Sequence, residues 1–172
     1  ELNSHLMLFF TGVNRTASDI AHSYSEDLEA KDQAMRAFGD MVHEGISILS
    51  REDDLERFGK LLHEAWVLKR SLSAKISNEH IEQLYEDARS AGAIGGKLLG
   101  AGGGGFMVLF VRPPDQERVR ERLRNLIYVP FRFELSGSRI IFFDPEEDDF
   151  KDEKVLANEH VRAFRELTPG PT

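Results

Sequence analysis

The stretch AIGGKLLGAGGGGFMVLFV, residues 93–111, decides the fold because two strand-like runs are joined by little except glycine. Eight of the fourteen glycines in the chain lie between Gly92 and Gly105. The run Gly100-Ala-Gly-Gly-Gly-Gly105 satisfies G-x-G-x-x-G, but a dinucleotide-binding turn requires a helix after the glycines. Here the following run, Phe106 to Val111, has the pattern of a strand. The stretch therefore predicts a strand, a glycine loop and a second strand.

The glycine loop contains more glycine than a hairpin needs, since two residues are enough to connect antiparallel strands. Glycine is retained where a Cβ atom would obstruct a neighbour or where several amides converge on an anion. One interpretation is therefore close approach by a phosphate or by another backbone, and the alternative is a flexible hairpin. Lys97, in the strand before the loop, is either an ordinary edge lysine or a cation that faces an anionic partner.

The segments before the loop predict one strand and several helices. Leu6 to Thr11 is a short apolar run ended by Gly12, which indicates a buried strand. Apolar residues at steps of three and four, with capping residues before them, predict four helices after it. These helices are one from Thr16 or Ser18 to about Leu28, one with an apolar stripe of Met35, Phe38, Val42, Ile46 and Leu49, one that begins in the capping box Ser50–Asp53, and one capped by Ser77 or Asn78.

The segments after the loop predict a charged helix from Asp115 to Leu126 and a hairpin of Phe131–Leu135 with Arg139–Phe143. The order of elements is then βαββαβ with extra helices in the first crossover and one added strand. We predict a ferredoxin-like α+β domain over residues 1–143, with an antiparallel sheet covered by helices on one face. Residues 144–172 are predicted to be an acidic linker and a peripheral helical tail.

Composition limits the classes of function. The chain has 172 residues and a formal net charge of -8, which disfavours nucleic acid and anionic membranes as partners. The absence of cysteine excludes a disulfide framework and a thiolate metal site. Without a membrane-spanning or signal-like run, a cytoplasmic location is expected. The chain starts at Glu1 and not at Met, so we expect it to be part of a longer protein.

Other candidate site residues are few. Thr11, Gly12 and Arg15 follow the first strand, where hydroxyl, amide and guanidinium groups could bind a polyhydroxylated or phosphorylated ligand. His43-Glu44 and His63-Glu64 begin like a zinc-binding helix motif, but no histidine follows four residues later in either case. Both histidines are predicted to be surface helix residues, and no metal site is expected.

The run Gly96-Lys-Leu-Leu-Gly-Ala-Gly-Gly-Gly-Gly-Phe106 resembles the C-terminal signature of the GHMP kinases, the family of galactokinase, homoserine kinase and mevalonate kinase. Leu8-Phe-Phe-Thr-Gly-Val-Asn-Arg15, His63-Glu-Ala-Trp66 and Val129-Pro-Phe-Arg132 resemble the branch that phosphorylates sugars at the anomeric position. The resemblance covers roughly residues 6–143. It implies the C-terminal half of an ATP-dependent sugar kinase that acts on a sugar or sugar phosphate, with D-glycero-D-manno-heptose 7-phosphate as the preferred substrate.

The same resemblance implies roles for particular residues. Gly100, Ala101, Gly102, Gly103 and Gly104, together with Lys97, match the signature that supports the nucleotide phosphates, and Thr11, Gly12 and Arg15 match the sugar-kinase segment. The serine-rich phosphate loop of the family has no match here. ATP, Mg²⁺ and the catalytic residues should therefore be held mainly by an N-terminal domain of the same full-length protein. This chain by itself should be inactive, with an apolar surface that favours self-association.

Two alternatives stay open on the sequence. One is a non-catalytic, ferredoxin-like regulatory domain in which the glycine loop binds a small-molecule effector. The other is a structural half that mainly supports a partner domain. A serine-rich phosphate loop encoded before Glu1 would favour the kinase over both.

Overall fold

The computed structural model of the protein describes residues 1–13, 28–51 and 54–140. It divides the chain into a unit Glu1–Phe133 and a second unit Glu134–Thr172. The predicted helix before Leu28 and the predicted acidic tail at 144–172 lie outside the described residues. The described elements are α1 (Leu2–His5), β1 (Leu6–Phe10), α3 (Leu28–Ser50), α4 (Glu56–Ser71), α5 (Glu79–Ser90), β2 (Ala93–Leu98), β3 (Phe106–Val111), the 3₁₀ helix η2 (Pro113–Asp115), α6 (Gln116–Arg122) and β4 (Ile127–Tyr128).

The strands form one antiparallel sheet in the order β2-β3-β1-β4. The strand β3 pairs with both β1 and β2, so that Val108 lies opposite Leu8 on one side and Lys97 on the other. The short strand β4 extends the sheet, with Tyr128 opposite Phe9. The predicted α+β class, with an antiparallel sheet and helices, is confirmed.

The predicted hairpin of Phe131–Leu135 with Arg139–Phe143 is wrong as far as the described residues reach. No residue from 129 to 140 lies in a strand. Instead, the N–H of Val129 donates to the carbonyl of Leu8 at 2.8 Å, and Pro130, which has no N–H, ends the pairing. The side chain of Asn3 then takes the place of a partner strand, because its Oδ1 accepts from the Phe133 N–H at 3.0 Å and its Nδ2 donates to the Phe131 carbonyl at 3.4 Å.

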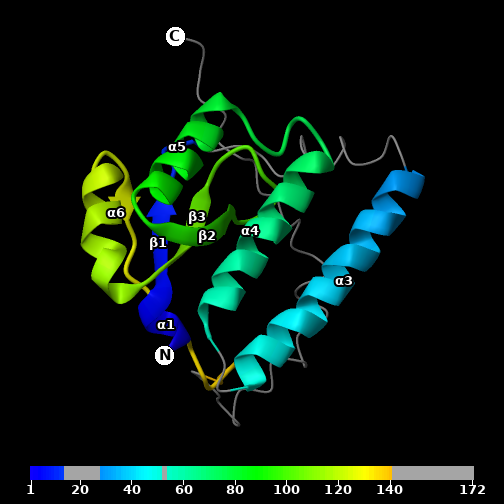
Figure 1. The fold of residues 1–172 in the computed structure, drawn as a ribbon, viewed down its shortest axis with the longest axis horizontal. Helices are drawn as coiled ribbons and strands as arrows, with labels where there is room; N and C mark the ends of the chain where they lie inside the picture. The colour runs from blue at the N-terminus through cyan, green and yellow to red at the C-terminus, as the bar shows by residue number, and fades with distance from the viewer. Residues whose placement is uncertain (14–27, 52–53, 141–172) are drawn as a thin grey trace, which may run out of the picture. The chain divides into compact units, whose positions relative to one another are not determined.

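The core lies between the sheet and the helices (Figure 1). Trp66 of α4 and Tyr85 of α5 are fully buried, and their ring centroids lie 6.1 Å apart. Asn78 is the N-cap of α5, as predicted, because its Oδ1 accepts from the Ile81 N–H at 3.1 Å. Other core side chains include Met7, Phe9, Leu98, Met107 and Leu109 of the strands, Ile81 of α5, Val119 of α6 and Ile76 from the connection between α4 and α5.

Helix α4 packs closely on β2 because both contribute glycine at the crossing. A Cβ atom on Gly95 would overlap the backbone carbonyl of Gly59. A Cβ atom on Gly59 would lie 2.7 Å from the ring of Phe110. The two backbones therefore approach more closely than side chains would allow, and the C-terminal turn of α4 reaches the end of β2. The predicted capping box at Ser50–Asp53 does not start this helix, which begins at Glu56 without a side-chain cap.

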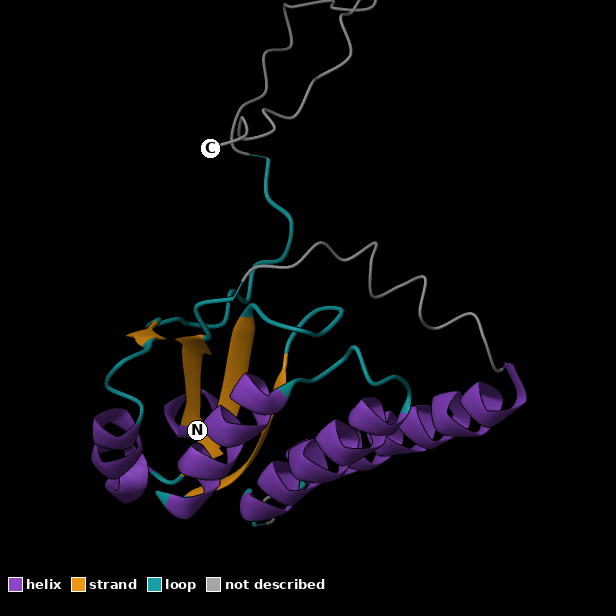
Figure 2. Cartoon of the chain, turned by 90° about the horizontal axis from the view of Figure 1, so that it is seen from above, coloured by secondary structure: helices purple, strands orange, loops and turns teal. Residues whose placement is uncertain are grey.

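Helix α3 leaves most of its predicted apolar stripe exposed within unit 1. In Figure 1, α4 lies between α3 and the strands, and Figure 2 shows the same arrangement from above. Within unit 1, α3 has α4 on one side, and its other apolar side chains remain exposed. Four of the five stripe residues are 43 to 60% exposed: Met35, Val42, Ile46 and Leu49. No helix in the described ranges is long and apolar enough to cross a membrane.

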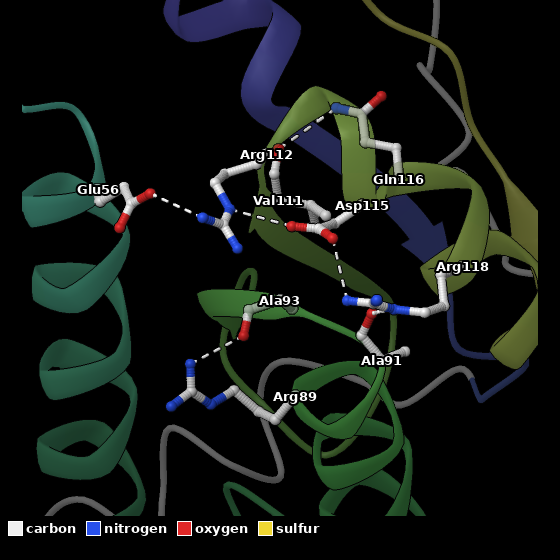
Figure 3. A network of polar contacts seen from close by, with 9 residues as sticks. All are labelled: Glu56, Arg89, Ala91, Ala93, Val111, Arg112, Asp115, Gln116 and Arg118. Atoms are coloured by element: carbon white, nitrogen blue, oxygen red, sulfur yellow. Dashed lines mark hydrogen bonds and ion pairs between the residues drawn. The ribbon is translucent and has the colours of Figure 1, made fainter.

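Polar contacts fasten the end of the sheet where β2 begins and β3 ends (Figure 3). The guanidinium of Arg112 lies 3.5 Å from Glu56 of α4 and 3.0 Å from Asp115. Arg118 pairs with the same Asp115 at 3.0 Å and donates to the Ala91 carbonyl at 2.7 Å. The carboxylates and arginines here satisfy one another, so the glycine loop at the opposite end of β2 and β3 is the better candidate for a site.

Candidate functional site

The glycine loop is tethered to two other segments by backbone hydrogen bonds. The N–H of Gly103 donates to the Ile76 carbonyl at 2.7 Å, and the Asn78 side chain donates to the Gly103 carbonyl at 3.1 Å. On the other side, the N–H of Gly105 donates to the Val13 carbonyl at 2.7 Å. The loop therefore joins the connection between α4 and α5 to the segment that follows β1. This arrangement argues against the flexible-hairpin interpretation.

Two of the loop glycines are required by these close approaches. Gly102 has a φ of +128°, and a Cβ atom there would lie 2.8 Å from the Ile76 carbonyl oxygen and 2.9 Å from its Cα. A Cβ atom on Gly104 would lie 2.5 Å from the Val13 carbonyl oxygen. Since real Cβ atoms almost never approach this closely, the chain needs glycine at both positions. The composition predicted that either a phosphate or another backbone approaches the loop closely. At Gly102 and Gly104 it is the backbone of another segment.

The ends of the loop have different surroundings. Gly100 has a φ of +71° and open space where a Cβ atom would be, whereas Ala101 is half-buried and packs against the core. The N–H groups of Gly103 and Gly105 are used by the protein itself. Among the residues the structure describes, no acceptor is found for the N–H groups of Gly102 and Gly104. The N–H of Gly100 has no acceptor in these residues either, and because Gly102 and Gly104 are buried while Gly100 is exposed, Gly100 carries the loop amide most accessible to an anion.

Lys69, in the last turn of α4, binds the start of the loop and was missed by the sequence analysis. Its Nζ donates to the Gly100 carbonyl at 2.6 Å and to the Leu98 carbonyl at 3.1 Å. Burial, with a smaller contribution from the nearby Lys97 charge, lowers the pKa of Lys69 to about 8. A basic residue in the last turn of a helix is so common that nothing in the sequence distinguishes it.

Lys97 lies on β2 opposite Val108, one residue before the end of that strand, and it is half-buried. Burial lowers the pKa of its ammonium group. In the described ranges the Lys97 ammonium group has neither an ion pair nor a hydrogen bond. If it faces an anionic partner, that partner is therefore not a carboxylate of the described ranges. Its side chain borders an apolar groove between α3 and α4 that includes Phe38, Leu61 and Leu62.

The segment after β1 touches the loop directly. Thr11 is 1% exposed, its N–H donates to the Gly105 carbonyl at 2.8 Å, and its hydroxyl donates to the same oxygen at 2.9 Å. Gly12 follows with a φ of +78° and open space around its Cα. The hydroxyl proton of Thr11 is thus used within the protein, while Gly12 is exposed. Arg15, the third predicted residue of this segment, lies outside the described residues.

A pocket of about 390 Å³ opens beside Thr11 and Gly12. Its polar lining includes His80, Asn125 and Arg122, with Leu123 and Leu126 among its apolar residues. The Nε2–H of His80 donates to the Thr11 carbonyl at 3.2 Å, and Arg122 pairs with Asp87 at 2.6 Å. The pocket has the mixed lining, with a few fixed polar groups, that small-molecule sites use.

An apolar row crosses the sheet next to the loop. Phe10 lies opposite Phe106 on one side and Ile127 on the other, and the N–H of Leu99 donates to the Phe106 carbonyl at 2.7 Å. Leu99, Phe106 and Ile127 are 39%, 42% and 65% exposed. This row matches the expectation of an apolar surface beside the glycine loop and the Thr11 segment.

His63 is not the surface residue that the sequence analysis predicted. It is half-buried on α4, its Nδ1 lies 2.7 Å from the Tyr85 hydroxyl, and the two rings are stacked with centroids 5.9 Å apart. Burial, followed by the charges of Arg89 and Arg70, lowers the pKa of His63, and burial raises the pKa of Tyr85 to about 12. A neutral His63 and a protonated Tyr85 therefore share one hydrogen bond. His43, by contrast, is exposed as predicted.

We expect the free energy of unfolding to fall as the pH drops below about 6.5, in part because of His63. With a lowered pKa in the folded state, His63 binds its proton more readily in the unfolded chain, so acid favours unfolding. Urea titrations at pH 7.5 and 5.5 should show a smaller pH effect in His63→Gln than in the wild type. His43→Gln, which changes an exposed histidine, should keep the wild-type pH effect. An equal pH effect in His63→Gln and the wild type would disprove the assignment.

The described residues fit a phosphate group better than they fit a metal ion. Amides of a glycine loop that have no protein acceptor are suitable donors to phosphate oxygens. For Mg²⁺, no group of three histidine, aspartate or glutamate side chains gathers anywhere in the described part of the chain. These residues can therefore position a phosphorylated ligand, and they provide no set of metal ligands.

Comparison with known proteins agrees with this geometry. Residues 46–129 match the family model described as GHMP kinases C terminal. The chain is 33% identical over 127 residues to D-glycero-alpha-D-manno-heptose 7-phosphate kinase of Campylobacter jejuni, covering 73% of this chain and 37% of that protein. It is 35% identical over 117 residues to mevalonate kinase of Aeropyrum pernix, covering 66% of this chain and 35% of that protein.

The fold is shared with solved kinase structures. The crystal structure of L. major mevalonate kinase in complex with R-mevalonate superposes with a TM-score of 0.63 at 22% identity, covering 70% of this chain and 37% of that one. This chain spans little more than a third of the length of these proteins. The matched residues include α4, α5, the glycine loop and β4. The chain therefore belongs to the GHMP kinase family and carries its C-terminal domain.

Proposed function

We propose that the full-length protein containing this chain is an ATP-dependent kinase that phosphorylates the anomeric hydroxyl of a sugar or sugar phosphate. D-glycero-D-manno-heptose 7-phosphate is the preferred acceptor. The observation that carries the proposal is the direct connection between the glycine loop and the Thr11 segment through Gly105. It brings a candidate phosphate-binding loop next to a candidate acceptor pocket. The names of the Campylobacter jejuni relative and of a bifunctional fucokinase of Arabidopsis thaliana, 28% identical over 130 residues, support a sugar acceptor.

The roles of individual residues follow from this arrangement. The nucleotide phosphates would be supported by Lys97, Gly100, Ala101, Gly102, Gly103 and Gly104. The support would come from the Lys97 charge and from loop amides without a protein acceptor, of which that of Gly100 is exposed. Thr11, Gly12 and Arg15 would contact the acceptor. Phosphoryl transfer depends mainly on positioning and charge neutralisation, which such groups provide without reacting themselves. ATP and Mg²⁺ would be held mainly by the N-terminal domain of the same protein, and the catalytic residues would lie there.

The domain arrangement is part of the proposal. The strand order β2-β3-β1-β4 with antiparallel neighbours supports a ferredoxin-like βαββαβ frame with extra helices in the first crossover. We propose that this domain extends over residues 1–143, that residues 144–172 form a linker and tail, and that the protein is cytoplasmic. The apolar row Leu99, Phe106, Phe10 and Ile127 would face the N-terminal domain, and without that domain it would favour self-association.

The decisive experiment is an assay of the full-length protein with ATP, Mg²⁺ and a panel of acceptors. We expect ADP release with D-glycero-D-manno-heptose 7-phosphate and a product phosphorylated at the anomeric carbon by ³¹P NMR. The 172-residue chain alone should release no ADP above background. Mevalonate belongs in the panel, because the Aeropyrum pernix relative makes it the second candidate acceptor. If no acceptor in the panel supports ATP turnover, the result would favour the non-catalytic regulatory domain instead.

Arg15→Lys in the full-length protein should weaken acceptor binding by roughly 1.5 to 3 kcal/mol, the range for a charged hydrogen bond. A guanidinium can hold two phosphate oxygens through parallel hydrogen bonds, whereas lysine offers a single point charge. The KM for the sugar phosphate should therefore rise while the KM for ATP changes little. A loss that fell on ATP, or on neither substrate, would show that Arg15 has another role.

A further inference from the structure

We propose that Lys69 is a positioning residue that fixes the start of the glycine loop from α4, so that the loop is held in its ligand-binding conformation. The proposal rests on the proposed function for its activity readout only. Its structural basis is a pair of contacts that Lys69 makes with the chain on either side of Leu99. None of these contacts involves a carboxylate.

The geometry places the Lys69 ammonium group where β2 ends and the loop begins. Leu98 is the last residue of β2, and its carbonyl accepts from Nζ at 3.1 Å. Gly100, with a φ of +71°, turns the chain out of the strand, and its carbonyl accepts from Nζ at 2.6 Å. One cation therefore holds two carbonyls that the turn directs to the same side. The hydrogen bonds between β2 and β3 end with the one from the Leu99 N–H to the Phe106 carbonyl. No residue of β3 therefore holds Gly100 in place.

The other two tethers of the loop act further along the chain. Ile76 and Asn78 hold Gly103, and Val13 and Thr11 hold Gly105. Neither tether reaches Gly100. The conformation of Gly100 is therefore set from α4 through Lys69, whereas Ala101 next to it packs against the core.

The contacts of Lys69 are costly to keep, which argues for a role beyond stability. Arg70, the next residue, pairs with Glu82 and lies 5.5 Å from the centre of the Trp66 ring, so its charge is compensated. In the described residues Lys69 has only carbonyl partners, and burial together with the Lys97 charge lowers its pKa to about 8. An ammonium group that the fold partly desolvates contributes less to stability than an exposed one. A methionine of similar length could fill the same space without the desolvation of a charge, although the two carbonyls would lose their charged donor.

The test compares four forms of the full-length protein: wild type, Lys69→Met, Lys69→Arg and the control Lys60→Met, which changes an exposed lysine on the same helix. The first readout is hydrogen exchange of the Leu99 amide, which lies between the two carbonyls that Lys69 holds, and of the Gly103 amide further along the loop. The second is the urea midpoint, and the third is kcat and KM for ATP and for the acceptor. Exchange reports the order of the loop whether or not the acceptor has been identified correctly.

In Lys69→Met we expect loop amides to exchange at least about tenfold faster, the lower limit for losing a charged hydrogen bond. Amides of β3 should exchange as in the wild type, and the urea midpoint should be unchanged or higher. The kcat should fall by a similar factor, with the KM for the acceptor little changed. Lys69→Arg, which keeps a charged donor, should recover part of both losses, and Lys60→Met should match the wild type.

Two results would overturn the proposal. The first is loop exchange in Lys69→Met equal to that of the wild type. The second is faster exchange in the loop and in β3 alike with a lower urea midpoint, because Lys69 would then support the whole fold and not the loop. If the wild-type protein phosphorylates no acceptor, the proposed function fails, and the exchange comparison still decides the role of Lys69.

Discussion

Gly102→Val in the full-length protein is expected to lower kcat by roughly 100-fold, the effect of an ångström-scale displacement in an active site. The valine Cβ would lie 2.8 Å from the Ile76 carbonyl oxygen, so the loop must move away from the connection between α4 and α5. The positive φ of +128° adds strain, because branched side chains disfavour that conformation. The change should be measured as kcat and KM for both substrates.

Two controls separate collision from strain in this experiment. Gly100→Val introduces the same side chain at a φ of +71°, but no atom lies within 4 Å of its Cβ, so it should lose less activity than Gly102→Val. Gly39→Val, on the exposed side of α3 with nothing within 4 Å, should retain wild-type turnover. Near-normal kcat in Gly102→Val would show that the contact with Ile76 is not needed for function.

Gly95→Val should cause the largest loss of stability, about 3 kcal/mol, the upper end of the usual range for overpacking. The Gly59 carbonyl of α4 occupies the space that the new Cβ atom would need, and a helix backbone cannot rotate away as a side chain can. Helix α4 would have to lift off β2, which exposes core contacts of Trp66. Urea unfolding of the 172-residue chain, followed by the fluorescence of its single tryptophan, measures the change.

The matched control is Gly39→Ala. Its Cβ would meet nothing within 4 Å, and alanine is favoured over glycine inside a helix by up to about 1 kcal/mol. It should therefore leave the chain as stable as the wild type or slightly more stable. If Gly95→Val unfolded at the same urea concentration as the wild type, the close crossing of α4 and β2 would be wrong.

The sequence was sufficient for features that depend on neighbours along the chain. The strands on both sides of the glycine loop were predicted because continuous apolar runs with β-branched and aromatic residues rarely form other structures when they are short. Asn78 was one of two predicted caps for α5, since an amide side chain before an amphipathic segment satisfies a free N–H. The interpretation of the loop as more than a hairpin depended only on its composition.

The features that the sequence could not supply all depend on contacts between distant segments. The fourth strand has only two residues and exists because Phe9 and Phe10 lie opposite them, whereas the alternating pattern at 131–135 found no sheet edge. Lys69 reaches a carbonyl 31 residues away, and His63 meets Tyr85 22 residues away. Composition also could not distinguish a phosphate from a second backbone as the neighbour of Gly102, because both exclude a Cβ atom.

The reciprocal hydrogen bonds between Gly105 and the segment after β1 have a thermodynamic consequence for the kinase. The N–H of Gly105 donates to Val13, and its carbonyl accepts from Thr11, so neither segment can shift without breaking bonds to the other. If the proposed function holds, a ligand that orders the glycine loop would also order the acceptor segment, so that the second ligand would lose less conformational entropy on binding. The proposal then predicts positive cooperativity between nucleotide and acceptor, with the same coupling free energy whichever ligand binds first.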